Sequence, residues 1–92
     1  MTLIAPVVNV NGSSSVELRR QYIDAYQALT LAQNALNAIE AHDRDYCRHR
    51  FDNAGELARE QKRGWVNSLE SVKKQLMAIN VAIIDNRGVA KV

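Results

Sequence analysis

Two long stretches of this sequence place apolar residues at alternating steps of four and three, and this spacing constrains the fold more than any other feature. The first stretch lies in residues 14–41, and no glycine or proline interrupts it after Ser14. Two apolar positions in every seven form a stripe along a helix that packs on another helix with a mild left-handed supercoil. We predict a helix over residues 14–41 whose contact stripe is Leu18, Tyr22, Ala25, Leu29, Ala32, Leu36 and Ile39.

The second stretch predicts another long helix, over residues 54–86. Gly64 interrupts this stretch at a cost of about 1 kcal/mol relative to alanine, and either a close helix contact beside Trp65 or sequence drift accounts for it. The Asn86-Arg87-Gly88 segment favours a helix stop, because glycine readily adopts the left-handed conformation found after many helices. The contact stripe of this helix is Leu57, Ala58, Gln61, Trp65, Leu69, Val72, Leu76, Ile79 and Ile83.

Capping patterns support both helix starts. Ser14 lies three residues before Glu17, and Asn53 lies three residues before Glu56; at this spacing the first side chain caps free amides of the first turn. Residues 42–53 are rich in charge and lack an apolar period, which predicts a loop. A short loop makes the two helices antiparallel neighbours. The predicted fold class is therefore all-α, an antiparallel two-helix hairpin that forms a single domain over residues 1–92.

Residues 1–13 predict an extended arm ahead of the first helix. Asparagine and valine alternate over residues 8–11, which is a weak strand signal, and Gly12 then turns the chain. A strand here has no expected partner in a chain that is helical elsewhere. It either pairs with the same segment of a second subunit or packs as an extended arm over the helices. Residues 87–92 are expected to form a tail.

The N-terminal ten residues are apolar, but they lack the basic segment and the small-residue cleavage site of a signal peptide. The single cysteine cannot form an internal disulfide, which fits a reducing cytoplasm. Both halves of the chain carry too much charge for a membrane span, so we expect no membrane association.

A lone pair of helices buries little apolar surface in a domain of this size. Several hydrophobic residues nevertheless lie beside or away from the two stripes: Ile23, Tyr26, Leu31, Val66, Met77, Val81 and Ile84. They either are scattered surface residues, which are common, or widen the apolar faces for partner subunits. We expect the second, a homo-oligomer that assembles into a dimeric or higher helical bundle.

No residue pattern indicates catalysis, a metal or a cofactor. His42, Cys47 and His49 cluster in the loop, but their spacing matches no usual zinc motif, and no further group supports Cys47 as a nucleophile. Asp43 and Asp45 flank an arginine and are interpreted as its partners. Glycine-rich phosphate loops are absent from the sequence. We expect no enzyme activity, no metal site and no cofactor.

The loop is the candidate binding site, because it concentrates arginines and aromatic rings. Guanidinium groups bind phosphate or carboxylate through paired hydrogen bonds, and Tyr46 and Phe51 could stack on a base. The alternative is that arginine–aspartate pairs only close the loop while Tyr46 packs under the end of the hairpin. The residues singled out here are Arg44, Asp45, Tyr46, Arg48 and Arg50.

A second basic group lies in the second helix and consists of Arg59, Lys62, Arg63, Lys73 and Lys74. Lys62 and Arg63 precede Lys73 and Lys74 by eleven residues, about three helical turns, so the four share one side. This side is either a solvated face paired with nearby glutamates or a shallow site for an acidic partner or nucleotide. Lys62 and Arg63 complete the set of candidate ligand-binding residues.

The Asn11-Gly12-Ser13 start, the capped first helix and the Arg44-Asp45-Tyr46 loop resemble a group of small phage and prophage proteins. That group has an Asn-Gly-Ser/Thr start and a Gly-Arg-Asp-Tyr-Tyr loop between two long helices. In this sequence Asp43 stands in place of the glycine and Cys47 in place of the second tyrosine. The resemblance implies a phage-encoded protein of the host bacterial cytoplasm and supplies no activity.

Two functions of different classes fit these features. The first is a non-enzymatic, oligomeric binding protein that captures an anionic, nucleotide-like ligand or blocks a host defence component. The second is a structural or interaction protein that docks a host or virion protein through its helical surface. Nucleic acid is an unlikely partner, because the net charge is only +2 and the basic residues are interleaved with acidic ones.

Overall fold

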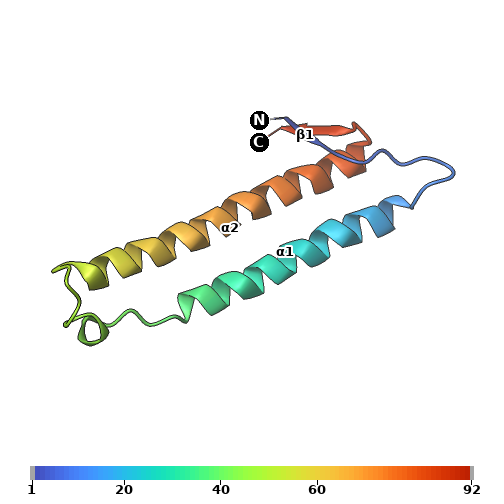
Figure 1. Cartoon of the computed structure of the whole chain (residues 1–92). Coiled ribbons are helices and arrows are strands. Elements are labelled where there is room, and N and C mark those ends of the chain that lie inside the picture. The colour runs from blue at the N-terminus through green and yellow to red at the C-terminus, as the bar shows by residue number, and fades with distance from the viewer. Residues whose placement is uncertain (1, 92) are drawn as a thin grey trace.

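The computed structural model describes residues 2–91 and shows two long antiparallel helices joined at one end by a loop (Figure 1). Helix α1 spans Ser15–Asn37 and helix α2 spans Ala54–Asp85, and a short 3-10 helix, η1 (Asp43–Asp45), lies in the loop. The predicted hairpin of two long helices is therefore confirmed. Residues 1 and 92, the ends of the predicted arm and tail, lie outside the described residues.

A small antiparallel sheet joins the two ends of the described chain. Strand β1 (Thr2–Ile4) pairs with strand β2 (Val89–Lys91), with Leu3 opposite Ala90. The expectation that an N-terminal strand lacks a partner in its own chain is therefore wrong, and the alternation over residues 8–11 forms no strand. The segment predicted as a tail supplies the partner, and its strand is too short to show a sequence period.

The sheet packs on the C-terminal end of α2 and forms the best-buried part of the molecule (Figure 1). Ala82 of α2 is fully buried there, between Ala5 and Ala90. The helix stop is at the predicted place, and Gly88 has the expected left-handed backbone (φ 76°), but the residue that caps the helix is Asn86, which is also left-handed (φ 53°). Its side-chain oxygen accepts a 2.7 Å hydrogen bond from the backbone N–H of Val8. One side chain therefore holds the N-terminal arm against the end of α2.

Only one of the two predicted N-caps is present. The Ser14 hydroxyl accepts a hydrogen bond from the backbone N–H of Glu17 at 3.2 Å, as predicted. Asn53 makes no side-chain cap. Its backbone (φ −106°, ψ 26°) is not in the extended conformation that aims a capping side chain at the first turn.

Helix α1 ends at Asn37, four residues before the predicted end. The backbone N–H of Ile39 bonds to the carbonyl of Leu36, three residues back, so the last turn is tightened. The carbonyl of Ile39 then accepts a 3.1 Å hydrogen bond from Lys62 of α2. A side chain of the other helix therefore binds the segment that directly follows α1.

The two helices meet along a seam that is rotated from the predicted stripes. Tyr22, Leu29 and Leu36 of α1 and Leu69, Leu76 and Ile83 of α2 lie in the seam as predicted, whereas its other positions lie one residue later than predicted. Tyr26 replaces Ala25, for example, and Lys73 replaces Val72. The seam consists of Arg19, Tyr22, Tyr26, Leu29, Gln33 and Leu36 on α1, and of Arg59, Lys62, Val66, Leu69, Lys73, Leu76, Asn80 and Ile83 on α2, all buried or half-buried.

A polar cluster at the middle of the seam gives the reason for this rotation. Lys73 is only 7% exposed, and its ammonium donates to the side-chain oxygen of Gln33 at 2.8 Å. The Gln33 amide in turn donates to the Glu70 carboxylate at 2.9 Å. The Lys73 ammonium also lies 4.6 Å from the centre of the Tyr26 ring. These contacts require Gln33 and Lys73 to face the other helix, which turns their apolar neighbours outward.

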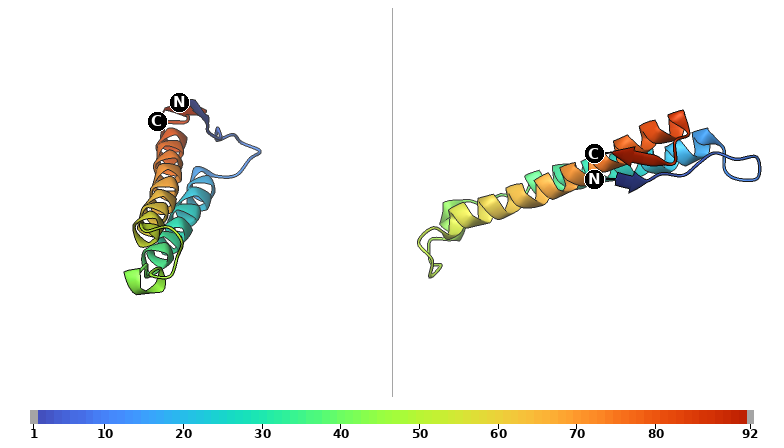
Figure 2. Two further views of the ribbon diagram at one scale, coloured as in Figure 1. Left: turned by 60° about the vertical axis from the view of Figure 1, so that its left-hand side comes forward. Right: turned by 90° about the horizontal axis from the view of Figure 1, so that it is seen from above.

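The hairpin is a thin rod, with extents of 63 × 23 × 15 Å (Figure 2). The helices lie side by side along most of its length, and the sheet adds a second layer only at one end. Among residues 2–91, neither helix combines the length and the apolar composition that a membrane crossing needs.

Candidate functional site

The loop forms the end of the rod farthest from the sheet, and α2 holds it in place (Figure 1). The Arg59 guanidinium donates to the carbonyl of Ala41 and to the carboxylate of Asp43, both at 2.9 Å. Gly55 leaves room for this carboxylate, because a Cβ at Gly55 would lie 2.5 Å from an Asp43 oxygen. The first turns of α2 therefore set the position of the loop.

The three arginines of the loop lie free of carboxylates. Arg44, Arg48 and Arg50 are exposed, and none forms an ion pair within residues 2–91. The interpretation of Asp43 and Asp45 as partners of Arg44 is wrong, because Arg59 binds the Asp43 carboxylate and no ion pair within residues 2–91 joins Asp45 to Arg44. These guanidinium groups therefore keep their hydrogen-bond donors available for a ligand.

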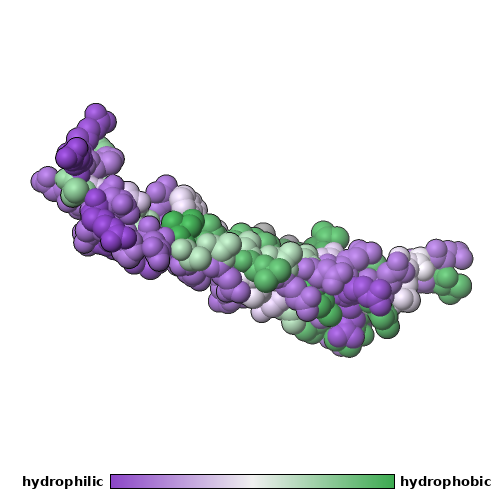
Figure 3. Space-filling view, turned by 90° about the horizontal axis from the view of Figure 1, so that it is seen from below, coloured by the Kyte–Doolittle hydropathy of each residue, from purple (hydrophilic) through white to green (hydrophobic). Residues whose placement is uncertain are grey.

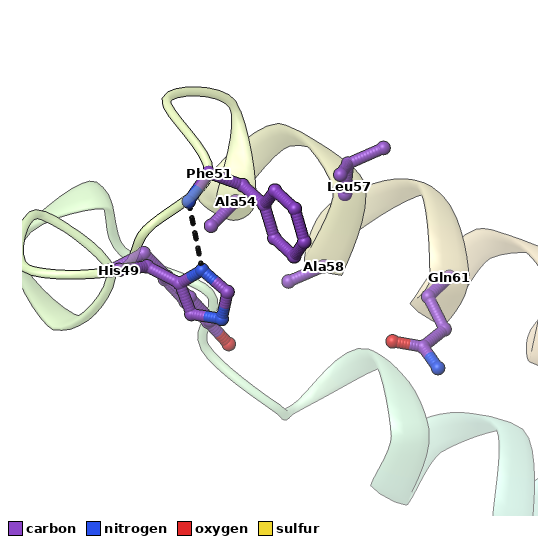
Figure 4. A pocket seen from close by; sticks show the side chains of 7 residues that line it. His49, Phe51, Ala54, Leu57, Ala58 and Gln61 are labelled. Carbon is purple, nitrogen blue, oxygen red and sulfur yellow. Dashed lines mark hydrogen bonds between the residues drawn. The ribbon is translucent and has the colours of Figure 1, made fainter.

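Two aromatic rings of the loop stack beside α2. The His49 and Phe51 rings lie 5.2 Å apart with an interplanar angle of 27°, and the backbone N–H of Phe51 donates to His49 Nδ1 at 3.2 Å. Figure 4 shows the Phe51 ring lying beside Ala54 and Ala58, with the His49 imidazole facing it from the loop. The Arg50 guanidinium is 5.3 Å from the centre of the Phe51 ring, within cation–π distance.

These rings form part of a pocket of about 250 Å³ between the loop and the first turns of α2 (Figure 4). The volume is somewhat below the roughly 300–1,000 Å³ of sites for drug-sized ligands. It suits one planar ring more than a whole nucleotide. The residues that line it are Tyr46, His49, Phe51, Ala54, Leu57, Ala58 and Gln61.

The predicted site residues fall into two groups. Tyr46 lines the pocket, and Arg44, Asp45, Arg48 and Arg50 lie in the same loop. The two predicted residues of α2 do not join them as a basic surface, because Lys62 is bonded to the end of α1. Arg63 is exposed on α2.

The expected basic side of α2 is therefore absent, since Lys73 is also buried in the seam. Sequence reasoning placed Arg59 in the basic group of the second helix and Gln61 in its contact stripe, and it assigned neither to the loop site, where Arg59 holds the loop and Gln61 lines the pocket. Both lie within the first two turns after the loop, and that proximity was the available signal.

The loop offers no metal site. Within residues 2–91, no group of histidine, cysteine, aspartate and glutamate side chains is arranged to hold a metal ion. Cys47 donates its thiol to the carbonyl of Arg44 at 3.3 Å, and His42 pairs with Glu40 at 3.1 Å. The three metal-ligand candidates of the sequence therefore make separate contacts.

The chain matches no family model, and no curated protein or solved structure is significantly similar to it. A functional proposal must therefore stand on the geometry of this chain.

Proposed function

We propose that this chain is a non-enzymatic binding protein that captures an anionic, nucleotide-like ligand at its loop end. The observation that carries the proposal is that three unpaired guanidinium groups share a loop with an aromatic-walled pocket. Arg44, Arg48 and Arg50 can each give paired hydrogen bonds to a phosphate. The rings of His49 and Phe51 offer flat surfaces to a base.

The anchoring of the loop supports the proposal. Lys62 and Arg59 bind the backbone carbonyls of Ile39 and Ala41, which follow the end of α1. A loop that is held before the ligand arrives loses less conformational entropy on binding, which favours affinity. The backbone that carries the arginines is thus partly ordered in advance.

The resemblance to phage proteins suggests a biological setting for this binding. We place the protein in the cytoplasm of an infected bacterium, working as an assembly of hairpins. Its role there is to withdraw a nucleotide signal of host defence or to block a defence protein.

A thermal-shift experiment tests ligand capture on the full chain. A panel of linear and cyclic nucleotides is added at about 150 mM salt, and at least one should raise the melting temperature by several degrees. A ligand at one hundred times its Kd stabilises the fold by about 2.7 kcal/mol. Arg44→Ala should abolish the shift, whereas Arg20→Ala, an exposed arginine of α1 far from the loop, should retain it. No shift with any nucleotide, or a full shift in Arg44→Ala, contradicts the proposal.

A second candidate function is the docking of a host or virion protein through the helical surface. Exposed apolar side chains such as Trp65 and Ile39 favour it. A partner captured from infected-cell lysate by the wild-type chain and lost with Trp65→Lys would support docking. Equal capture by both chains would exclude this surface.

A further inference from the structure

The rotation of the helices leaves the predicted contact stripes on the surface of the hairpin. In each helix, the apolar residues that directly precede seam positions are exposed or half-buried, and Ala25 and Ala32 of α1 and Trp65 and Val72 of α2 are exposed. In an antiparallel pair, the positions that precede the seam in one helix lie on the same side as those that precede it in the other. The two helices therefore share one exposed apolar face.

We name this surface the uncharged face, because none of its residues is ionisable. Residues 18–37 extend about 29 Å along α1, so the face covers about half of the 63 Å length of the rod. Figure 3 shows hydrophobic side chains gathered in a band along the middle of the molecule. The uncharged face consists of Leu18, Ala25 and Ala32 of α1, of Ile39 just after α1, and of Leu57, Ala58, Gln61, Trp65 and Val72 of α2, and the half-buried seam residues Leu29, Leu36, Leu69 and Leu76 border it.

The total exposed area shows that this chain has only a small core of its own. Its solvent-accessible surface is 6724 Å², whereas a compact monomer of 10.3 kDa exposes roughly 5,400 Å². Its radius of gyration is 18.8 Å, against about 12 Å for a compact domain of this length. Among residues 2–91, Ile83 is the only large side chain that is fully buried.

The excess area is the size that a dimer needs. Roughly 1,300 Å² of extra surface exceeds the ~800 Å² that each partner buries in an interface of standard size. An exposed apolar face of this length on a folded chain usually marks an interface.

We propose that a second copy of this chain covers the uncharged face and forms a two-fold, four-helix bundle. A partner must bring an equally long surface without charges, and a second copy has one of the same length and composition. Two-fold pairing places identical surfaces against each other, and four-helix bundles bury apolar stripes of this spacing. The opposite side of the hairpin is a poorer candidate, because Arg63 and Glu70 interrupt it.

This inference uses the helical face and none of the loop arginines, so it goes beyond ligand capture and does not depend on it. The two sites nevertheless meet at the loop end of the rod. Leu57 and Ala58 belong to the uncharged face and also line the pocket. A second copy would therefore close the pocket from one side.

Size-exclusion chromatography with light scattering tests the pairing on the full chain at about 100 μM. The wild-type chain should have twice the 10.3 kDa mass of one chain. Val72→Lys, which places a charge at a 43% exposed position of the uncharged face, should have the mass of one chain and keep its helical circular dichroism. Val81→Lys is the matched control, a 47% exposed valine on the other side of the same helix, and it should remain dimeric.

Several outcomes overturn the proposal. They are a wild-type mass other than two chains, a dimeric Val72→Lys, or dissociation of Val81→Lys. If Val72→Lys loses its helical circular dichroism, Ala32→Lys is used in its place, because it puts a charge on the same face from α1. Ligand capture is read separately by the nucleotide shift, so failure of one proposal leaves the other standing.

The fluorescence of Trp65, the one tryptophan of the sequence, gives a second readout of pairing that does not depend on measuring the mass. Trp65 is 46% exposed on one chain and would be covered by a second copy. Its emission in Val72→Lys should lie to the red of the wild-type emission, with stronger quenching by acrylamide. The Val81→Lys emission should match the wild type. Identical emission in all three chains contradicts coverage of the face.

Discussion

Lys73 is buried between the helices although it carries a charge, and Gln33 is the residue that makes this possible. Moving an ammonium group out of water costs several kcal/mol unless partners replace the lost hydration. The Gln33 oxygen lies 2.8 Å from the Lys73 ammonium, and a Glu70 oxygen lies 3.7 Å away. Because these partners sit on both helices, they favour one rotation of the hairpin over others with equal apolar burial.

Gln33→Leu should therefore destabilise the hairpin by about 1–3 kcal/mol, since a buried charge loses its nearest acceptor. The double variant Gln33→Leu/Lys73→Leu should recover most of that loss, because no buried charge remains. Urea unfolding followed by circular dichroism measures both. A single variant as stable as the wild type would show that Lys73 reaches water by another route.

Gly64→Ala should stabilise the chain by up to about 1 kcal/mol, because alanine has the higher helix propensity. Nothing lies within 4 Å of the position that a Cβ would take, so the change meets no steric obstacle. The close helix contact considered for this glycine is therefore absent within the chain. A loss of stability in urea unfolding would mean that another molecule packs against Gly64.

At the scale of elements, the end of α2 and the N-terminal arm depend on one another. Strands of three residues are too short to be stable alone, so β1 and β2 depend on their packing against Ala82. Asn86 contributes twice, through its left-handed backbone and through its bond to Val8. The small sheet is therefore a cap on α2 more than an independent layer.

Substitutions of Asn86 should separate these two contributions. Asn86→Gly keeps the left-handed conformation without strain and loses only the bond to Val8, at a cost of about 0.5–1.5 kcal/mol. Asn86→Ala loses the bond and also bears roughly 1–2 kcal/mol of backbone strain. Urea unfolding should rank wild type above Asn86→Gly and Asn86→Gly above Asn86→Ala. Equal stability of the two variants would argue against a strained cap.

At the scale of the whole molecule, unfolding should depend on pH through Glu70. The hydrogen bond from Gln33, aided by the charges of Lys73 and Lys74, lowers the pKa of Glu70 below its ordinary value of 4.5. A carboxylate whose pKa is lowered on folding stabilises the folded state above pH 4.5, and this contribution is lost as the pH falls through the lowered pKa. The stability advantage of wild type over Glu70→Gln should therefore be larger at pH 7 than at pH 3.

Urea midpoints at the two pH values measure this difference. Glu60→Gln is the matched control, because Glu60 is an exposed glutamate of the same helix, and its effect should change less with pH. An advantage over Glu70→Gln that is the same at both pH values would exclude Glu70 as the source.

The melting temperature should also rise with protein concentration, because association stabilises the folded chain by mass action. We expect this rise for the wild type and for Val81→Lys, and its absence for Val72→Lys. Differential scanning calorimetry over a hundredfold range of concentration checks it. A concentration-independent melting temperature for the wild type would exclude coupling between folding and pairing.

Much of the candidate site could be read from the sequence, because its residues are neighbours along the chain. The predicted loop residues from Arg44 to Arg50 do lie together, and Tyr46 does line the pocket. The grouping of Lys62 with Arg63 as a basic surface failed for a physical reason. The Lys62 ammonium gains a hydrogen bond to the unbonded carbonyl of Ile39. Helical spacing does not reveal which lysines can reach such a carbonyl.

The sequence by itself determined the two helices, their antiparallel order and the Ser14 cap, because apolar periodicity and capping are local properties of a chain. Only the tertiary structure decided which side of each helix faces the other. Apolar spacing identified the stripes through Ala32 and Val72, but the helices meet at Gln33 and Lys73, each one residue later along the chain. The tertiary structure also decided the pairing of β1 with β2, which lie at opposite ends of the described chain. The physical reason is the same in both cases: hydrogen bonds between residues distant in sequence leave no periodic signal.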